Sequence, residues 1–252
     1  MTDPSDLDLL LLAADIADRE SMRTWRSDDL DVEVKPDGSP VSATDKLIER
    51  LLRELLAEHR PHDRILGEEE GATGSGRRCW VLDPIDGTGS FVTGRRAWGS
   101  LIALEIDDGP VAGMVSMPAL GRRWWGTIEV GALHTEAPHA TPRPIRVSNE
   151  TSADAIRWSS GPVIDELSGE ERARIARFEG RGRYVPMSEW TTYPALMVAD
   201  GSLELAVHFG QHLDHAALAA VVVAAGGRVT DDPAPGDGRR YAATFTNGHI
   251  AH

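Results

Sequence analysis

Three carboxylates and a hydroxyl group lie close together in the chain, each at the end of an apolar run: Glu68, Asp83, Asp86 and Thr88. Pro84 prevents the two aspartates from sharing one face of a helix, whereas a turn there can direct both carboxylates into one space. Carboxylates gathered in this way repel one another, and a divalent cation removes the repulsion. Because all these ligands are oxygens, without a cluster of Cys and His, the pattern favours Mg²⁺ over zinc.

Gly87-Thr88-Gly89 follows directly after the second aspartate. Backbone N–H groups without bulky side chains, at the start of a short helix, form a site for an anion. Hydrolysis of a phosphate ester needs cations beside such amides, since the cations hold the phosphate, lower the pKa of a water and stabilise the leaving oxygen. The alternative is that Asp-Pro and Asp-Gly are ordinary turns and that Glu68 to Glu70 is a solvated acidic loop. The ordered set favours catalysis over this alternative.

The run Trp80 to Thr88, preceded by Gly67 to Glu69, resembles the signature of the inositol monophosphatase superfamily. This superfamily includes inositol monophosphatases, bisphosphate nucleotidases and one class of histidinol-phosphate phosphatases. The segment Lys35 to Asp45 is similar to the family's upstream loop and helix, and Asp214 with the alanine-rich helix after it is similar to the downstream metal motif. The resemblance covers essentially the whole chain and implies an α/β fold, a layered αβαβα sandwich.

The same resemblance implies a set of metal ligands. Glu68, Asp83 and the carbonyl group of Ile85 would hold one Mg²⁺. Asp83, Asp86 and Asp214 would hold a second. A third, weaker ion would lie near Glu68, so the expected cofactor is two to three Mg²⁺ ions.

The resemblance also implies catalytic and phosphate-binding roles. Asp45 and Thr88 would orient and deprotonate the attacking water, and Glu68 would act with them. The backbone amides of Gly87 and Thr88 would bind the phosphate, with Lys35 as a nearby positive group. The expected reaction is hydrolysis of a phosphomonoester by direct in-line attack of a metal-activated water, without a phosphoenzyme.

The substrate is a small phosphorylated metabolite, and the segment Pro118 to Trp125 is most similar to the histidinol-phosphatase class. The first expectation is therefore L-histidinol phosphate, an intermediate of histidine biosynthesis. Trp124 and Trp125 could equally pack on the two faces of a strand. Inositol-1-phosphate or another polyol or sugar phosphate is the alternative, and a nucleotide bisphosphatase would need a base-binding pocket that the sequence does not indicate. From another class, a non-catalytic relative that only binds a phosphorylated metabolite or a partner stays open.

Several departures from the family pattern fall on the side that would face the substrate. Leu213 stands where the family usually has Trp, and His208 lies where an acidic residue often meets the substrate. Trp190 and Thr191 replace a pair of small residues. These departures leave phosphate hydrolysis intact and leave the alcohol open. Lys35, Trp190, Thr191 and His208 are the candidate substrate contacts.

The elements that must position these residues alternate between helix and strand, as in layered α/β proteins. Apolar spacing predicts helices at 6–25, 42–56, 168–178, 193–199 and 213–225, and strands at 64–66, 80–82, 100–106, 111–117, 122–127, 155–159, 182–185, 203–207 and 242–246. The strand at 80–82 is expected to end at Asp83, and 71–76 is expected to be a mobile glycine-rich loop. The polar, proline-rich segment 135–144 marks a boundary between two halves, 1–140 and 141–252.

Composition limits the class of partner. The chain has 252 residues, 41% of them hydrophobic, which is enough to bury a full core. With 26 basic and 40 acidic residues the net charge is −14, which disfavours binding to nucleic acid and to anionic membranes. A single cysteine, Cys79, and the lack of a signal-like or membrane-spanning run predict a cytoplasmic protein. The family resemblance adds a homodimer and lithium sensitivity.

A second metal site is an alternative use of His208, His212 and His215, which cluster around Asp214. Their spacing without a paired Cys gives little support to such a site. We expect these histidines to lie at the surface or behind the carboxylates instead.

Overall fold

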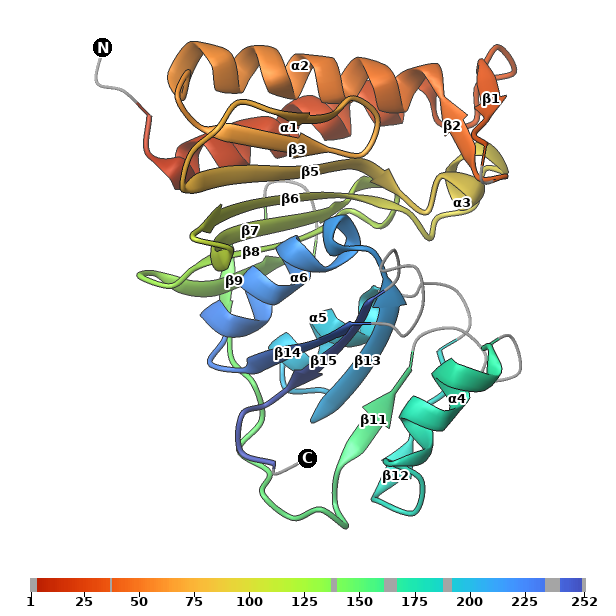
Figure 1. The fold of residues 1–252 in the computed structure, drawn as a ribbon, viewed down its shortest axis with the longest axis vertical. Coiled ribbons are helices and arrows are strands. Elements are labelled where there is room, and N and C mark those ends of the chain that lie inside the picture. The colour runs from red at the N-terminus through yellow and green to blue at the C-terminus, as the bar shows by residue number, and fades with distance from the viewer. Residues whose placement is uncertain are drawn as a thin grey trace.

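The structure is a computed structural model, and it describes residues 4–36, 38–136, 140–160, 167–187, 192–233 and 241–250. Two mixed β-sheets alternate with layers of helices in these residues (Figure 1). One outer layer consists of α1 (Asp6–Thr24) and α2 (Ala43–His59). The layer between the sheets consists of α5 (Tyr193–Ala199) and α6 (His212–Ala224). The outer layer at the opposite end is α4 (Gly169–Ala176). The expected αβαβα sandwich is confirmed.

The first sheet has eight strands in the order β10-β9-β8-β7-β6-β5-β3-β4. Its strands are β3 (Arg64–Gly67), β4 (Gly71–Thr73), β5 (Arg78–Asp86), β6 (Gly99–Ile106), β7 (Gly109–Met117), β8 (Arg122–Thr127), β9 (Gly131–Thr135) and β10 (Arg143–Ile145). Only β3 and β5 pair in parallel among these neighbours. From β5 to β9 the chain therefore runs as an antiparallel meander, as the alternating apolar residues predict.

The second sheet has five strands in the order β12-β11-β13-β15-β14. They are β11 (Arg157–Ser159), β12 (Arg183–Tyr184), β13 (Leu205–Gly210), β14 (Arg228–Pro233) and β15 (Tyr241–Thr246). Two short elements stand apart from both sheets: a hairpin of β1 (Val32–Val34) and β2 (Pro40–Ser42), and the helix α3 (Thr88–Val92). A short 3-10 helix, Pro118–Leu120, joins β7 to β8.

Alternation along the strands divides the core into separate clusters. In β5, Trp80 and Leu82 face α1 and α2, whereas Val81 faces α5 and α6. Trp124 and Trp125 of β8 follow the same rule and are buried on opposite faces of the sheet. Packing therefore accounts for the tryptophan pair, and the pair by itself does not indicate a substrate. None of the helices in the described ranges has the length and hydropathy needed to span a bilayer.

The expectation that the strand at 80–82 ends at Asp83 is wrong, because β5 continues to Asp86. Pro84 has no N–H to give to the sheet, and the pairing of β5 with β6 shifts register between Asp83 and Asp86. Such an irregularity bends a strand and redirects its side chains. The carbonyl oxygen of Pro84 accepts a 2.6 Å hydrogen bond from the hydroxyl group of Ser100, which fixes the bend.

Two segments that the sequence predicts as loops contain strands. Residues 71–73 form β4, which pairs with β3 at the edge of the sheet, so the expectation of a mobile loop over 71–76 is wrong for this part. The polar segment 135–144 leads from β9 into β10, which is still part of the first sheet. A division of the chain near residue 140 stays a prediction.

Two buried histidines face each other where β13 packs against α6. His208 of β13 and His215 of α6 are 4% and 3% exposed, and their ring centroids lie 5.0 Å apart. Burial lowers the pKa of His208 to about 4, and burial followed by the charges of His208 and His212 lowers that of His215 well below its usual value. A buried imidazole is held neutral, so the unfolded chain binds protons more readily than the folded one.

We expect the free energy of unfolding to fall as the pH drops from 6.5 towards 4, by about 3 kcal/mol for His208 alone. Above pH 6.5 His208 causes no loss of stability, because its imidazole is neutral in both the folded and the unfolded chain. Urea unfolding of the parent and of His208→Leu at pH 7.5 and 4.5 measures it, and the variant should lose less stability. An equal loss in the two proteins would contradict the expectation.

Candidate active site

Three aspartates from two elements converge on one point. Asp83 and Asp86 lie on the bent end of β5, and Asp214 lies in the first turn of α6. One carboxylate oxygen of each lies within 4.8 Å of those of the other two. In the described ranges this is the only group of three or more Asp, Glu, His or Cys residues close enough to share a metal ion. Residues far apart in the chain thus meet where the first sheet contacts the helix layer between the sheets.

The convergence of Asp214 depends on how α6 begins. Asp214 completes a capping box, in which its Oδ2 accepts a 2.7 Å hydrogen bond from the backbone N–H of Gln211. A Cβ at Gly210 would lie 2.3 Å from that same oxygen, so only glycine leaves room for the carboxylate. Asp86 is held in turn by the hydroxyl group of Thr192, which donates to its Oδ2 at 3.3 Å.

A pocket of about 200 Å³ opens at the three aspartates. Besides them it is lined by Ser39, Pro40, Glu68, Ile85, Gly87, Thr88 and Gly89. Every residue that the sequence predicts as a metal or phosphate ligand therefore faces one space. Glu68 stands outside the group of three aspartates and enters the pocket from the turn after β3.

Asp83 lies in an environment that disfavours its charge. Its side chain is 2% exposed, and burial raises its pKa well above the usual value, with further increases from the charges of Glu68, Asp86 and Asp214. Its Oδ1 is buried and has no hydrogen-bond partner among the described residues. A buried carboxylate oxygen without a donor is costly. A cation bound between the carboxylates would remove both the repulsion and the missing contact.

The donor set fits a hard divalent cation. Carboxylates and the carbonyl group of Ile85 supply only oxygen, which suits Mg²⁺ and does not suit a soft metal. The histidines do not form an alternative group in the part of the chain that the structure describes. His212 instead pairs with buried Glu105 at 3.0 Å, Nε2 to Oε2, on the side of α6 that faces β6.

Asp45 and Thr88 form a pair at the edge of the pocket. The Thr88 hydroxyl oxygen lies 3.2 Å from Asp45 Oδ1 and 2.9 Å from the carbonyl oxygen of Ile85. Asp45 Oδ2 is occupied by the cap of α2, where it accepts from the backbone N–H of Ser42 at 2.9 Å and from its hydroxyl group at 2.5 Å. Burial raises the pKa of Asp45, and the bonds from Ser42 act against this rise. One oxygen of the carboxylate is thus fixed, and the other is left for the hydroxyl group.

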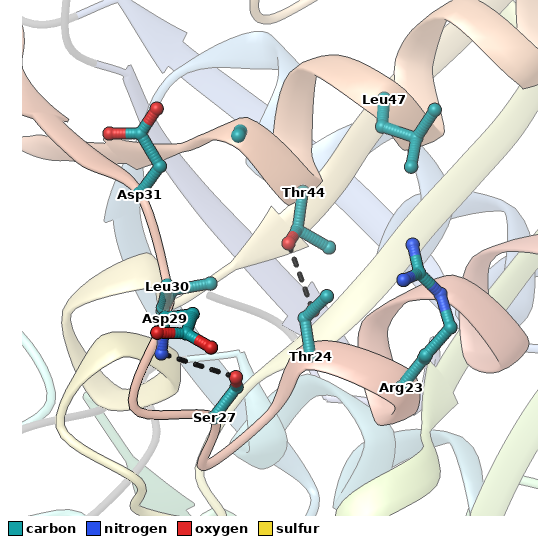
Figure 2. A pocket seen from close by; sticks show the side chains of 9 residues that line it. Arg23, Thr24, Ser27, Asp29, Leu30, Asp31, Thr44 and Leu47 are labelled. Carbon is teal, nitrogen blue, oxygen red and sulfur yellow. Dashed lines mark hydrogen bonds between the residues drawn. The ribbon is translucent and has the colours of Figure 1, made fainter.

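The start of α2, which carries Asp45, is supported from behind. The hydroxyl groups of Thr24 at the end of α1 and Thr44 lie 2.9 Å apart, within hydrogen-bond distance (Figure 2). They border a pocket of about 150 Å³, separate from the one at the aspartates. Asp31 and Arg23 lie at opposite ends of this second pocket in Figure 2, so its charges do not converge on one point. The contact between Thr24 and Thr44 joins the start of α2 to the end of α1.

Gly87 makes the turn from β5 into α3. Its φ of +80° lies in the left-handed region, and a Cβ there would come within 2.8 Å of the carbonyl oxygen of Ala97. The turn places Thr88 at the first position of α3, where backbone N–H groups have no acceptor within their own helix. The amides that the sequence predicts to bind phosphate therefore border the pocket.

Lys35 reaches the site from the end of β1. Its Nζ donates to Glu68 Oε1 and Glu69 Oε1, each at 2.9 Å. Partial burial would lower the pKa of Lys35, but the hydrogen bonds that it donates to these two carboxylates, together with their charges, outweigh burial and raise it. Lys35 is therefore a fixed positive charge beside Glu68.

The remaining predicted substrate contacts are less informative. Trp190 and Thr191 lie outside the described residues. His208 is buried in β13 against His215 and does not border the 200 Å³ pocket. Roles for these three residues in substrate binding stay predictions.

Sequence reasoning missed Glu49, the buried residue that holds the Glu68 turn. Glu49 is fully buried on α2, and its carboxylate accepts from the backbone N–H groups of Glu69 and Glu70 at 2.7 and 3.0 Å. The sequence does contain a signal for a buried carboxylate here. Glu49 is one turn after Asp45 and lies between Ile48 and Leu52 in the apolar stripe of the helix.

Comparison with known proteins agrees with the geometry. The model of the Inositol monophosphatase family matches residues 9–247. The chain is 42% identical to "Histidinol-phosphatase" of Streptomyces coelicolor, over 97% of this chain and 93% of that one, and 38% identical to "Histidinol-phosphatase" of Mycobacterium tuberculosis, over 96% and 94%. The solved IMPase of Thermotoga maritima superposes with a TM-score of 0.74 at 26% identity, over 96% and 92% of the two chains. The chain belongs to the inositol monophosphatase family, a family of phosphomonoesterases.

Proposed function

We propose that this phosphatase is Mg²⁺-dependent and hydrolyses L-histidinol phosphate to histidinol and phosphate. The observation that carries the reaction class is the meeting of Asp83, Asp86 and Asp214 within 4.8 Å of one another, beside the turn at Gly87 and Thr88. A buried, unpaired carboxylate oxygen among like charges is poorly suited to a site that works without a cation.

In this proposal the two expected metal sets share Asp83. Glu68, Asp83 and the Ile85 carbonyl group would hold one Mg²⁺, and Asp83, Asp86 and Asp214 a second, with a third near Glu68. When bound, the cations supply positive charge that holds the phosphate, favours deprotonation of the attacking water and stabilises the leaving oxygen.

The protein's own groups orient and deprotonate the water. Thr88 Oγ1 accepts a hydrogen bond from the water, and the proton passes through this hydroxyl group to Asp45 Oδ1. The water oxygen forms a bond to phosphorus on the side opposite the alcohol. As the phosphorus–oxygen bond to the alcohol breaks, the alcohol oxygen keeps the electron pair and takes up a proton from a solvent water, and Asp45 returns its proton to solvent. The amides of Gly87 and Thr88 hold the phosphate in line for this step.

The choice of alcohol rests on the relatives. Two proteins that match this chain over nearly their full length carry the name histidinol-phosphatase, at 42% and 38% identity. The solved neighbour named IMPase is more distant in sequence, at 26% identity, and keeps inositol-1-phosphate as the second candidate. The pocket residues named above bind the phosphate end and do not separate the two alcohols.

Turnover of L-histidinol phosphate, inositol-1-phosphate and glucose-6-phosphate at one Mg²⁺ concentration tests the proposal. We expect kcat/KM for histidinol phosphate to exceed each of the others by about tenfold or more. Phosphate release should stop in EDTA and return when Mg²⁺ is added. A preference for inositol-1-phosphate would replace the substrate and keep the chemistry, whereas release that is unaffected by EDTA would overturn the metal dependence. No release from any of the three would favour a relative that only binds phosphorylated metabolites.

We also propose that the enzyme acts as a homodimer in the cytoplasm, on a small-molecule substrate and without nucleic acid. The family resemblance supports the dimer, and the net charge of −14 disfavours a nucleic-acid partner. Light scattering of the purified protein determines its mass in solution, and a single-chain mass of 27.3 kDa would contradict the dimer.

A further inference from the structure

Glu49 and Arg53 lie one turn apart on α2 and bond to the residues that directly follow Glu68. The Glu49 carboxylate accepts from the backbone N–H of Glu69 at 2.7 Å and of Glu70 at 3.0 Å. The Arg53 guanidinium donates to the carbonyl oxygen of Gly71 at 2.5 Å and, through its other nitrogens, to the hydroxyl group of Thr73 at 2.8 Å and to Glu49 Oε1 at 2.9 Å.

The fit around the Glu49 carboxylate is close and specific. The side chain of Glu49 is completely buried, and that of Arg53 is 11% exposed. A Cβ at Gly67 would lie 2.0 Å from Glu49 Oε1 and 2.7 Å from an Arg53 nitrogen, so glycine at this position leaves the space that the pair occupies. A buried carboxylate with charge-assisted bonds to two amides and a guanidinium is fully satisfied, unlike Asp83.

The same helix carries Asp45 one turn earlier than Glu49. Because α2 is one rigid element, the bonds of Glu49 fix the Glu68 turn relative to Asp45. Glu68 itself is bonded to β5 through its backbone N–H, which donates to the carbonyl oxygen of Leu82 at 3.1 Å, and its side chain is bonded to Lys35. A carboxylate that must meet a cation at a fixed place gains from such support.

We propose that Glu49, paired with Arg53, is a positioning residue that holds Glu68 in place for the metal ion, which sets the affinity of the site for Mg²⁺. The inference rests on the proposed metal dependence and adds to it a residue that touches neither metal nor substrate. Removing a group that orients a metal ligand commonly weakens metal binding or activity by about 10- to 100-fold.

Glu49→Gln tests this because glutamine keeps the size of the side chain and loses the charge. Calorimetric titration of the metal-free protein with Mg²⁺ should show affinity reduced by about 10- to 100-fold. Hydrogen exchange of the peptide spanning 67–73, measured without metal, should be faster in the variant. The activity should recover in part at high Mg²⁺. The Mg²⁺ concentration that gives half-maximal activity should change more than kcat does. Glu54→Gln, on the exposed side of the same helix, is the matched control and should behave as the parent.

Two further variants keep the test decisive if Glu49→Gln folds poorly. Arg53→Gln leaves Glu49 in place and should change exchange and affinity in the same direction by a smaller factor. Gly67→Ala pushes the carboxylate away without removing it, and its effect should be smaller when Glu49 is already glutamine. Unchanged Mg²⁺ affinity in folded Glu49→Gln, with only reduced stability, would overturn the positioning role. Absence of Mg²⁺ binding in the parent protein would instead overturn the proposed function.

Discussion

Purified Asp83→Asn protein should lose about a thousandfold or more of its kcat/KM and, without metal, should unfold at a higher temperature than the parent. Asp83 belongs to both proposed metal sets, and metal stabilisation of a transition state is worth several kcal/mol, of which each 1.4 kcal/mol is a factor of ten. In metal-free protein the same charge is unfavourable, because burial and three nearby carboxylates raise the pKa of Asp83. The charge of Asp83 is therefore needed for activity and lowers the stability of the metal-free protein.

The sign of the stability effect depends on pH. An acid whose pKa is raised on folding destabilises the folded state increasingly as the pH rises above the unfolded value, near 4, towards the folded one. The thermal midpoint of the variant in EDTA should therefore exceed that of the parent more at pH 8 than at pH 5. For a chain of this length each kcal/mol moves the midpoint by about 2–4 °C.

Melting curves in EDTA and steady-state kinetics in Mg²⁺ measure the two effects on the same preparations. Asp28→Asn, an exposed aspartate outside the pocket, is the control and should leave both unchanged. Near-normal turnover of Asp83→Asn would discard the mechanism. A lower midpoint in EDTA at pH 8 would contradict the electrostatic account of the pocket.

Thr88→Val should lower kcat by about 10²- to 10³-fold and leave the affinity for Mg²⁺ unchanged. Valine keeps the shape of threonine and loses the hydroxyl group that lies 3.2 Å from Asp45 Oδ1. A positioned acid or base commonly contributes 10²- to 10⁴-fold. Thr93→Val, which removes a hydroxyl group bonded to the Gly89 carbonyl oxygen at the other end of α3, is the matched control.

Combining Thr88→Val with Asp45→Asn tests whether the two residues act on one proton. If the proton passes through Thr88 to Asp45, the double variant should be little worse than either single one, since each alone blocks the same route. Losses that multiply would show independent roles and contradict the relay. Stopped-flow or steady-state assays on the four proteins at saturating Mg²⁺ give the comparison.

The parts of the fold that depend on patterns of neighbouring residues were predictable from the sequence. Alternating apolar residues in 100–127 predict the meander, and Ser42 predicts the start of α2, because these signals depend on neighbours in the chain. The continuation of β5 through Pro84 was not predictable, since a proline is tolerated only where the partner strand shifts register. The strands at 131–135 and 143–145 were missed because their pairing, rather than their composition, defines them.

Some residues of the candidate site were likewise predictable from the sequence, and others were not. Asp83, Asp86 and Thr88 are neighbours in sequence, and their family motif identifies them together with Asp214. Glu49 could not be assigned a partner, because its hydrogen bonds reach a turn about twenty residues away that only the packing of α2 on the sheet brings near. Gly67 and Gly210 likewise have their reason in side chains, Glu49 and Asp214, that approach them only in the folded protein.

The place of Asp214 on α6, between the two sheets, has a consequence during synthesis. A nascent chain that has emerged as far as β12 can form every strand of the first sheet and already carries Asp83 and Asp86. It lacks the third carboxylate and the helix that buries the inner face of that sheet. On the proposed metal sets, the nascent chain lacks a ligand of the second Mg²⁺, so we expect hydrolytic activity only after the late-made helix docks onto the early-made sheet.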